Sequence, residues 1–421
     1  MYFSALLKCS RLFINSNLSI LTHQFIERIQ MKKHLFLLAV GLLLASASAF
    51  SQMTFSGYMF GDYYYNVARD SSFNHKTPAA SALSSAAPGP VAMQAFQFRR
   101  IYFTMDDNIS DVFAARLRLE ADQAANPGVT SPNTTTPPSS ADELASGKMA
   151  PFIKEAWLTW KNVFVGSNLT FGTQLTPGFA ISEANWGYRF LEKTIMDQKG
   201  LVGAVDLGIS LRGKLTSDGT FNYWLMIGNN SASGTVPENN KYKRYYADIQ
   251  YITSNTWNAT AYVDYSDAAD LATKTGLVGN STLTEAVYVG YGRSTLTATV
   301  PTQTNLGVEA FMQQTANGYT ATGATSPSSK NALGYWVYGQ YYFVPDWAVI
   351  ARYDSYDPNT ASDNAAKGDS RNYVLGGFVY KPDARVFISP NIVYESYETP
   401  VGGASIKASV TARLTFWYIY L

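Results

Sequence analysis

The sequence predicts an all-β chain: a transmembrane antiparallel β-barrel of about sixteen strands with an inward-folded third long loop. Three observations predict it. From Thr54 to the C-terminus, segments of about ten residues alternate apolar with polar side chains, and Gly, Pro, Asn, Asp and Ser gather between them. The connections between these segments alternate between short and long. One long connection is rich in large apolar side chains, unlike the others.

The N-terminal part is expected to lie outside the barrel. Residues 31–51 begin with two lysines after Met31, continue as an apolar run over 35–44 and end in small residues, which is the pattern of a secretory signal peptide. A membrane-anchoring helix is the alternative, but the run is shorter than the roughly 20 residues that a spanning helix needs. Residues 1–30 lie upstream of a complete signal-peptide pattern. We interpret them as an extension that results from a start codon assigned too far upstream.

The remaining chain, residues 52–421, has a composition that excludes several functions. It lacks the only cysteine, Cys9, and it loses five of the 32 basic residues but only one of the 31 acidic residues. A slightly acidic exported chain is a poor nucleic-acid binder, because phosphate backbones are bound by clustered cations. Of three histidines only His75 remains, so neither a serine hydrolase site nor a metal cluster is expected. We therefore expect neither an enzyme nor a cofactor.

Sixteen strands are predicted from the alternation of apolar and polar residues. They cover residues 54–67, 95–107, 110–122, 152–161, 167–175, 203–215, 219–229, 242–252, 256–265, 284–296, 304–314, 331–343, 346–356, 371–381, 384–396 and 405–420.

Short and long connections follow one another in strict order along this series. The short ones are residues 107–110, 161–167, 216–219, 253–256, 300–304, 344–345 and 381–383. The long ones are residues 71–93, 123–151, 177–202, 230–240, 267–282, 315–329, 357–369 and 398–403. This order is what an even-numbered barrel requires when both termini lie at the short-turn rim. A soluble sandwich has no reason to place every long connection on one side.

Each strand is expected to have one apolar and one polar face. In residues 244–252, for example, Ile249 and Tyr251 alternate with Asp248 and Gln250. The apolar series contains many alanines and ends in aromatic residues near the turns, which favours contact with lipid. A closed barrel satisfies every backbone group in the bilayer. The polar face would then line an aqueous lumen, since sixteen strands enclose more space than side chains fill.

Charged residues on the polar face are candidates for lining this lumen. They are Arg100, Arg116, Arg118, Glu120, Arg212, Lys214, Arg244, Asp248, Arg352 and Arg413. Their cations could form a wall that favours anionic solutes. Acidic residues share the same face, so cross-strand ion pairs that brace the wall are an equal alternative.

The third long loop carries aromatic and aliphatic side chains over residues 180–202, so it should pack against something. We predict that it folds into the barrel as a constriction that exposes Glu183, Arg189, Glu192 and Lys193 to the passing solute. The alternative places the loop on the rim or at a subunit contact.

Two motifs in this region resemble a known family. Residues 171–179, Phe-Gly-Thr-Gln-Leu-Thr-Pro-Gly-Phe, and residues 186–194, Trp-Gly-Tyr-Arg-Phe-Leu-Glu-Lys-Thr, followed by Asp197, are similar to a strand and inward loop of the phosphate-selective porin O and P family and its Bacteroidetes-type relatives. Residues 98–103 and 110–113 are similar too. The resemblance implies a homotrimeric sixteen-stranded porin of the bacterial outer membrane.

The C-terminal strand keeps Leu414, Phe416, Tyr418 and Tyr420 in alternation, which resembles the signal read by the barrel-assembly machinery. The expected function is passive diffusion of small hydrophilic solutes, with an anion preference left open, in contact with outer-membrane lipid. The alternative is a non-conducting barrel that acts as an adhesin, receptor or structural anchor through its long loops; a soluble lectin-like sandwich is a more distant one.

Overall fold

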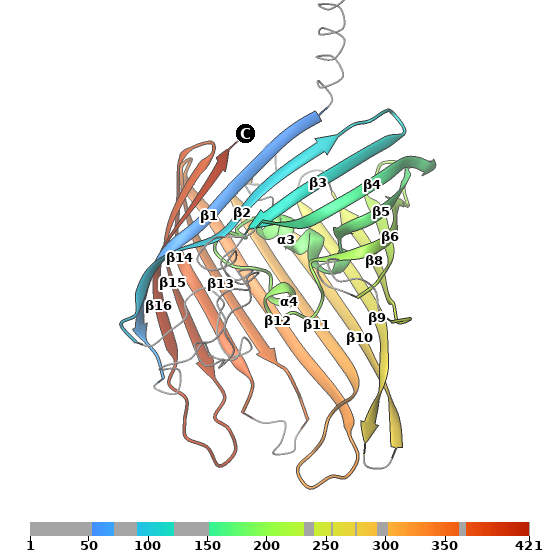
Figure 1. Cartoon of the computed structure of the whole chain (residues 1–421). Coiled ribbons are helices and arrows are strands. Elements are labelled where there is room, and N and C mark those ends of the chain that lie inside the picture. The colour runs from blue at the N-terminus through green and yellow to red at the C-terminus, as the bar shows by residue number, and fades with distance from the viewer. Residues whose placement is uncertain are drawn as a thin grey trace, which may run out of the picture. The chain divides into compact units, whose positions relative to one another are not determined.

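A computed structural model describes residues 53–70, 91–121, 151–230, 240–253, 256–273, 276–292, 302–361 and 368–420. The predicted signal peptide at 31–51, the extension at 1–30 and His75 lie outside these ranges. Sixteen strands form one closed barrel in which each strand pairs with its neighbours in sequence and β1 pairs with β16 (Figure 1). The predicted fold class is therefore confirmed.

The strands are β1 (Met53–Ala68), β2 (Gln94–Asp107), β3 (Phe113–Ala121), β4 (Phe152–Phe164), β5 (Ser167–Leu175), β6 (Val205–Lys214), β7 (Phe221–Gly228), β8 (Arg244–Ile252), β9 (Trp257–Thr273), β10 (Gly276–Tyr291), β11 (Thr304–Tyr319), β12 (Ser328–Val344), β13 (Trp347–Asp357), β14 (Arg371–Asp383), β15 (Val386–Tyr397) and β16 (Ser409–Tyr420). The first strand begins and the last strand ends at the same rim (Figure 1).

Two predicted long loops are wrong. The segment 267–282 is a hairpin, since β9 continues to Thr273 and β10 begins at Gly276. The segment 315–329 is shortened in the same way, with Tyr319 of β11 opposite Ser328 of β12. Polar residues on both faces, such as Asp267 and Asp270 in β9 and Gln314 and Thr315 in β11, interrupt the alternation in these strand ends and weaken the period-two signal. Strands that extend beyond the lipid can pair through their backbones without an apolar face.

The outer surface of the barrel is apolar, as the alternation predicted. Ile249 of β8 and Val287 of β10 are more than half exposed, whereas Asp248 and Tyr288, one position away, are buried inside. A shallow hollow in this surface is lined by alanines of neighbouring strands.

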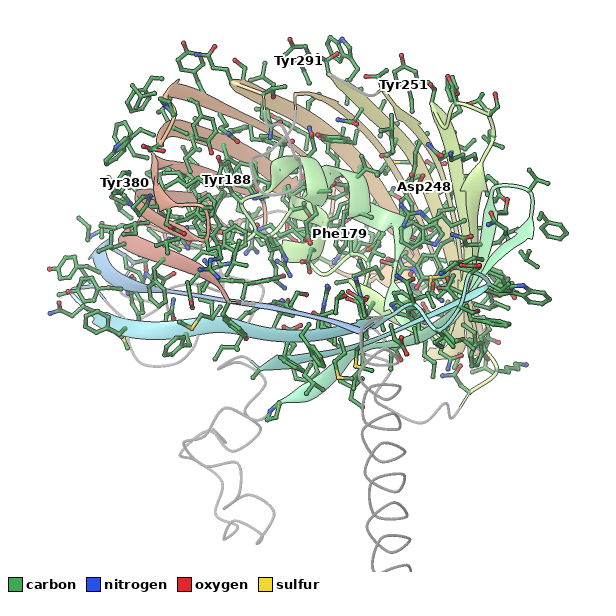
Figure 2. All side chains as sticks on the ribbon, turned by 90° about the horizontal axis from the view of Figure 1, so that it is seen from above. Phe179, Tyr188, Asp248, Tyr251, Tyr291 and Tyr380 are labelled. Carbon is green, nitrogen blue, oxygen red and sulfur yellow. The ribbon has the colours of Figure 1, made fainter. Side chains whose placement is uncertain are left out.

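Aromatic pairs lie near the short-turn rim, among them Phe221 with Tyr251 at 5.1 Å between ring centroids and Trp347 with Tyr380 at 4.5 Å. Figure 2 shows Tyr251, Tyr291 and Tyr380 at the edge of the ring of strands. This distribution is that of a lipid-facing wall with an aromatic girdle. Among the described residues, no helix has the length and hydropathy to cross a bilayer.

Candidate functional site

The third long loop lies inside the barrel. After β5 it forms a 3-10 turn, η2 (Pro177–Phe179), and two short helices, α3 (Ala180–Trp186) and α4 (Ile195–Gln198). Figure 2 looks down the barrel and shows α3, with Phe179 and Tyr188, within the ring of strands. Thr176 joins the two ends of the loop, because its hydroxyl donates to the Gly203 carbonyl at 2.6 Å. The predicted inward fold of the loop is confirmed.

Aromatic stacking holds the loop against the inner wall. Trp186, which is fully buried, lies 5.7 Å from Trp336 and 4.9 Å from Tyr338, both on β12. On the opposite side, Phe190 stacks on Trp417 of β16 at 5.2 Å. Large buried aromatic rings each remove roughly 150–250 Å² from water, so these contacts account for the loop's unusual composition.

Polar side chains of the wall satisfy the loop's backbone. Arg99 of β2 donates to the carbonyls of Phe190 and Leu191 at 2.9 and 2.8 Å. Arg352 of β13 donates to the carbonyl of Lys193 at 2.5 Å. An irregular segment inside a barrel needs such partners, because each buried backbone group without one costs free energy.

Glu192 supplies the negative charge through which the loop is held against the wall of the barrel. Its side chain is 0% exposed and lies 3.6 Å from the Arg99 guanidinium and 3.8 Å from that of Arg413, while the Tyr373 hydroxyl donates to it at 3.4 Å. Burial opposes ionisation, but the charges of Arg99 and Arg413 lower the pKa of this carboxyl. The prediction that Glu192 faces the solute is wrong, because the residue is enclosed between the loop and the wall.

Four other charged side chains of the loop lie beside the lumen. The Arg189 guanidinium pairs with Glu183 at 3.1 Å and with Asp197 at 3.0 Å, and Lys193 pairs with Asp197 at 3.3 Å. Burial disfavours the charge of Asp197, yet the cations around it lower its pKa to about 2; they include Arg100 and Lys154 of the barrel wall. The loop cluster and the wall of β2–β4 therefore interact electrostatically. Glu183, Arg189 and Lys193 keep 33%, 17% and 26% exposure, and their contact with a passing solute stays a prediction.

In the wall formed by β2–β4, the cations keep exposed surface, whereas most of the carboxylates that pair with them are buried. Glu120 and Glu155 are each 1% exposed. Arg100 and Lys154 both pair with Glu120 at 3.0 Å, and Arg118 pairs with Glu155 at 2.5 Å. The side chains of these cations keep 14–20% exposure. Arg116 extends the row and pairs with Asp106 at 2.6 Å. The cross-strand ion pairs of the second alternative are therefore present in this wall, and its cations keep some exposed surface, while their effect on anionic solutes stays a prediction.

Several predicted lumen residues do not line open space. Arg244 pairs with Asp264 at 2.7 Å and donates to the Leu201 carbonyl, so the loop covers it. Arg352 pairs with Asp354 at 2.6 Å. Like these two, the predicted residues Glu120, Asp248 and Arg413 are buried. The alternation placed these residues correctly on the inner face of the barrel. It could not show which residues of that face are covered by the loop or by a neighbouring side chain.

The remaining two predicted residues lie on β6. The Arg212 guanidinium lies 4.7 Å from the centroid of the Trp224 ring, and both residues line a cavity of about 340 Å³ on the inner wall of β3–β7. Lys214 is exposed at the end of the strand.

Arg99 and Lys154 also belong to this site, although the alternation of apolar and polar residues did not predict them. Arg99 precedes Arg100, so strict alternation places one of the two on the lipid side, yet both contact residues of the lumen. An arginine that faces lipid is energetically costly, so two consecutive arginines in a strand indicate that both side chains turn inward. This cost could have predicted the position of Arg99. Among the described residues, no group of three His, Cys, Asp or Glu side chains could hold a metal ion.

These features define a class: a sixteen-stranded outer-membrane barrel with the porin fold and a loop-narrowed lumen. The closed barrel and its apolar outer surface confirm the predicted outer-membrane location.

Particular solved structures share this fold. The outer membrane channel DcaP of Acinetobacter baumannii matches with a TM-score of 0.57 and 15% identity, over 87% of this chain and 97% of that one. The anion-selective porin from Comamonas acidovorans matches with a TM-score of 0.52 and 11% identity, over 87% and 99% of the chains. OmpF of Salmonella typhi matches with a TM-score of 0.50 and 11% identity, over 87% and 97%. No family model and no curated protein matches the sequence.

Proposed function

We propose that this protein is a passive porin for small hydrophilic solutes and that it prefers anions. The observation that carries the proposal is the placement of charge on the two sides of the constriction. Arg100, Arg118 and Lys154 on the wall keep exposed surface, while Glu120 and Glu155 lie beneath them. On the loop, Arg189 and Lys193 lie near enough to Arg100 of the wall to interact with it electrostatically. Glu183 of the loop is 33% exposed, but these five partly exposed cations outnumber it, which favours anions.

The size of the preference follows from Coulomb's law. One unit charge about 8 Å from a monovalent ion in water contributes about 0.5 kcal/mol, which is about a twofold change in partitioning. Removal of two lumen cations should therefore lower the partitioning of anions about fivefold and raise that of cations by the same factor, so the anion-to-cation permeability ratio should fall about 25-fold. Their carboxylate partners remain, which adds to the change.

The test is the reversal potential of the purified protein in a planar bilayer under a salt gradient. The double variant Arg189→Gln with Lys193→Gln should shift the potential towards cation preference. Arg385→Gln is the matched control, since Arg385 is an exposed cation in the turn between β14 and β15, outside the constriction. An unchanged potential in the double variant contradicts the proposal, and so does cation preference in the unmodified protein. A bilayer without stepwise currents favours the non-conducting barrel, which would act through its long loops.

The motifs at residues 171–179 and 186–194 support kinship with the phosphate-selective porin O and P family, and the loop that carries the second motif is the constriction itself. Phosphate should then reduce chloride current at concentrations well below that of chloride. We also propose a homotrimer inserted by the barrel-assembly machinery, to be tested by the mass of the detergent-solubilised complex. We assign the protein no catalytic role and no cofactor, since passive diffusion needs neither.

A further inference from the structure

The lumen contains an apolar cavity that passage of ions does not require. It has a volume of about 430 Å³ and lies between the third loop and the inner wall formed by β1 and β16. Tyr58 and Phe60 of β1, Trp417 of β16 and Phe179 and Phe190 of the loop contribute to its lining. The volume is within the range of cavities that hold small organic molecules, roughly 300–1,000 Å³.

The aromatic rings of this cavity form one connected surface. Tyr58 lies 5.6 Å from Trp417 in an edge-on arrangement, and Phe190 stacks on Trp417 at 5.2 Å. Phe387 extends the stack at 5.0 Å from Trp417. Such a surface presents ring faces and edges in fixed positions, so it complements another flat apolar group better than it does a hydrated ion.

Part of this apolar surface is left open in the lumen. Leu175 is 38% exposed, Ala184 is exposed, and Tyr58 and Ile419 are only half-buried, although all four line the same cavity. Apolar surface in contact with water costs about 25 cal/mol per Å² relative to its burial. A solute that covers this surface would recover that free energy.

Charged side chains in the lining of the cavity determine which polar group such a solute can carry. Arg189 and Glu183 both line the cavity and pair with each other at 3.1 Å. The Arg189 guanidinium also pairs with Asp197 at 3.0 Å, and Arg100 of β2 interacts electrostatically with both Arg189 and Asp197. The negative charge of Glu183 is therefore already compensated by Arg189, and the neighbouring wall contributes further positive charge. A carboxylate fits this position better than an amine.

We propose that the cavity is a binding site for organic anions with a flat apolar body, whose ring rests on the aromatic surface at Tyr58 and Trp417 while the carboxylate faces Arg189. The inference rests on the proposed porin function and adds a class of solute to it. Inorganic anions and small aliphatic acids pass without being held there, because they have no ring to bury.

Benzoate, acetate and benzylamine at equal concentration are the probes. Benzoate should interrupt single-channel chloride current at concentrations about tenfold lower than acetate, since only its ring reaches the cavity. Tyr58→Ala should abolish the difference between benzoate and acetate. Tyr65→Ala is the matched control, because Tyr65 is on the same strand but faces outward and is 38% exposed; it should retain the difference. Ala184→Trp, which fills the cavity, should also abolish it.

Equal effects of benzoate and acetate on the unmodified channel would overturn the proposal, as would full benzoate block in Tyr58→Ala. Stronger block by benzylamine would overturn the assignment of charge. Quenching of tryptophan fluorescence by benzoate in detergent separates this inference from the porin function. If the protein carries no current but benzoate quenches its fluorescence saturably, the binding site is supported and the porin function is refuted. If the protein carries current but benzoate neither blocks it specifically nor quenches the fluorescence, only the binding site is refuted.

Discussion

Substitution of Glu192 by glutamine should release the third loop from the wall of the barrel. The carboxylate lies between Arg99 of β2 and Arg413 of β16, at 3.6 and 3.8 Å. The Arg413 side chain is buried, donates a hydrogen bond to Asn391 at 3.0 Å and also interacts with Tyr373. Glutamine keeps the volume of the side chain and an acceptor for Tyr373, but it removes the charge that compensates two buried guanidinium groups.

The expected loss follows from these contacts. Breaking a buried ion pair costs about 3–5 kcal/mol. Arg99 keeps Asp62 at 3.7 Å and two backbone carbonyls, so we expect a value at the lower end, about 3 kcal/mol. At about 1.4 kcal/mol for each factor of ten, the population of undocked loop should rise about 100-fold.

Hydrogen exchange of residues 186–198 measures this population directly, and the noise of the single-channel current should increase with it. Glu183→Gln is the matched control. Glu183 is one-third exposed and pairs with Arg189 alone among the described ion pairs, so its loss should cost less than about 1 kcal/mol. Exchange in Glu192→Gln within threefold of the unmodified protein would refute the role assigned to this carboxylate.

Two further predictions concern the strand before the loop and the charge cluster within it. Gly172 of β5 has a φ of +128°, and a Cβ there would lie 2.2 Å from the Ala156 carbonyl oxygen. Gly172→Ala should therefore reduce the heat-modifiable folded band on a gel, whereas Gly376→Ala, where a Cβ meets nothing within 4 Å, should leave it intact. The pKa of Asp197 is lowered to about 2, so its contribution of about 2 kcal/mol is present above pH 4 and is lost as the pH falls towards 2. Hydrogen exchange of the loop at pH 7, 4 and 2.5 measures it, and the same pH dependence in Asp197→Asn would contradict the assignment.

The strands could be predicted because lipid and water impose opposite demands on neighbouring residues. Ile249 and Asp248 differ in polarity for that reason, and the same contrast recurs in other strands, as where exposed Leu414 lies between buried Arg413 and Thr415. In the hairpin of β9 and β10, polar residues such as Asp267 and Asn280 interrupt the alternation, and the strands continue to Thr273 and from Gly276 without a period-two pattern that the sequence could reveal. Backbone pairing alone extends them there.

The candidate site was predictable in part. Large apolar side chains in a long loop indicated that it packs inside the barrel, whereas contact of Arg189 and Lys193 with the solute stays a prediction. The role of Glu192 could not be predicted, because its partners come from β2, β14 and β16 and no local pattern connects them. Arg99 was missed because alternation assigns a face to each residue without weighing the cost of a cation in lipid.

The partners of Glu192 also determine when the lumen is narrowed during biogenesis. Arg99 belongs to the second strand and Arg413 to the last, so the carboxylate lacks one counter-ion until the final strand of the nascent polypeptide is in place. Ring closure and docking of the helical segment are thus thermodynamically linked. An intermediate without the last strand would keep the contacts of this segment with β12 and β13 but would lack those with Arg413 and Trp417, so its pore would reach a fixed width only when the barrel closes.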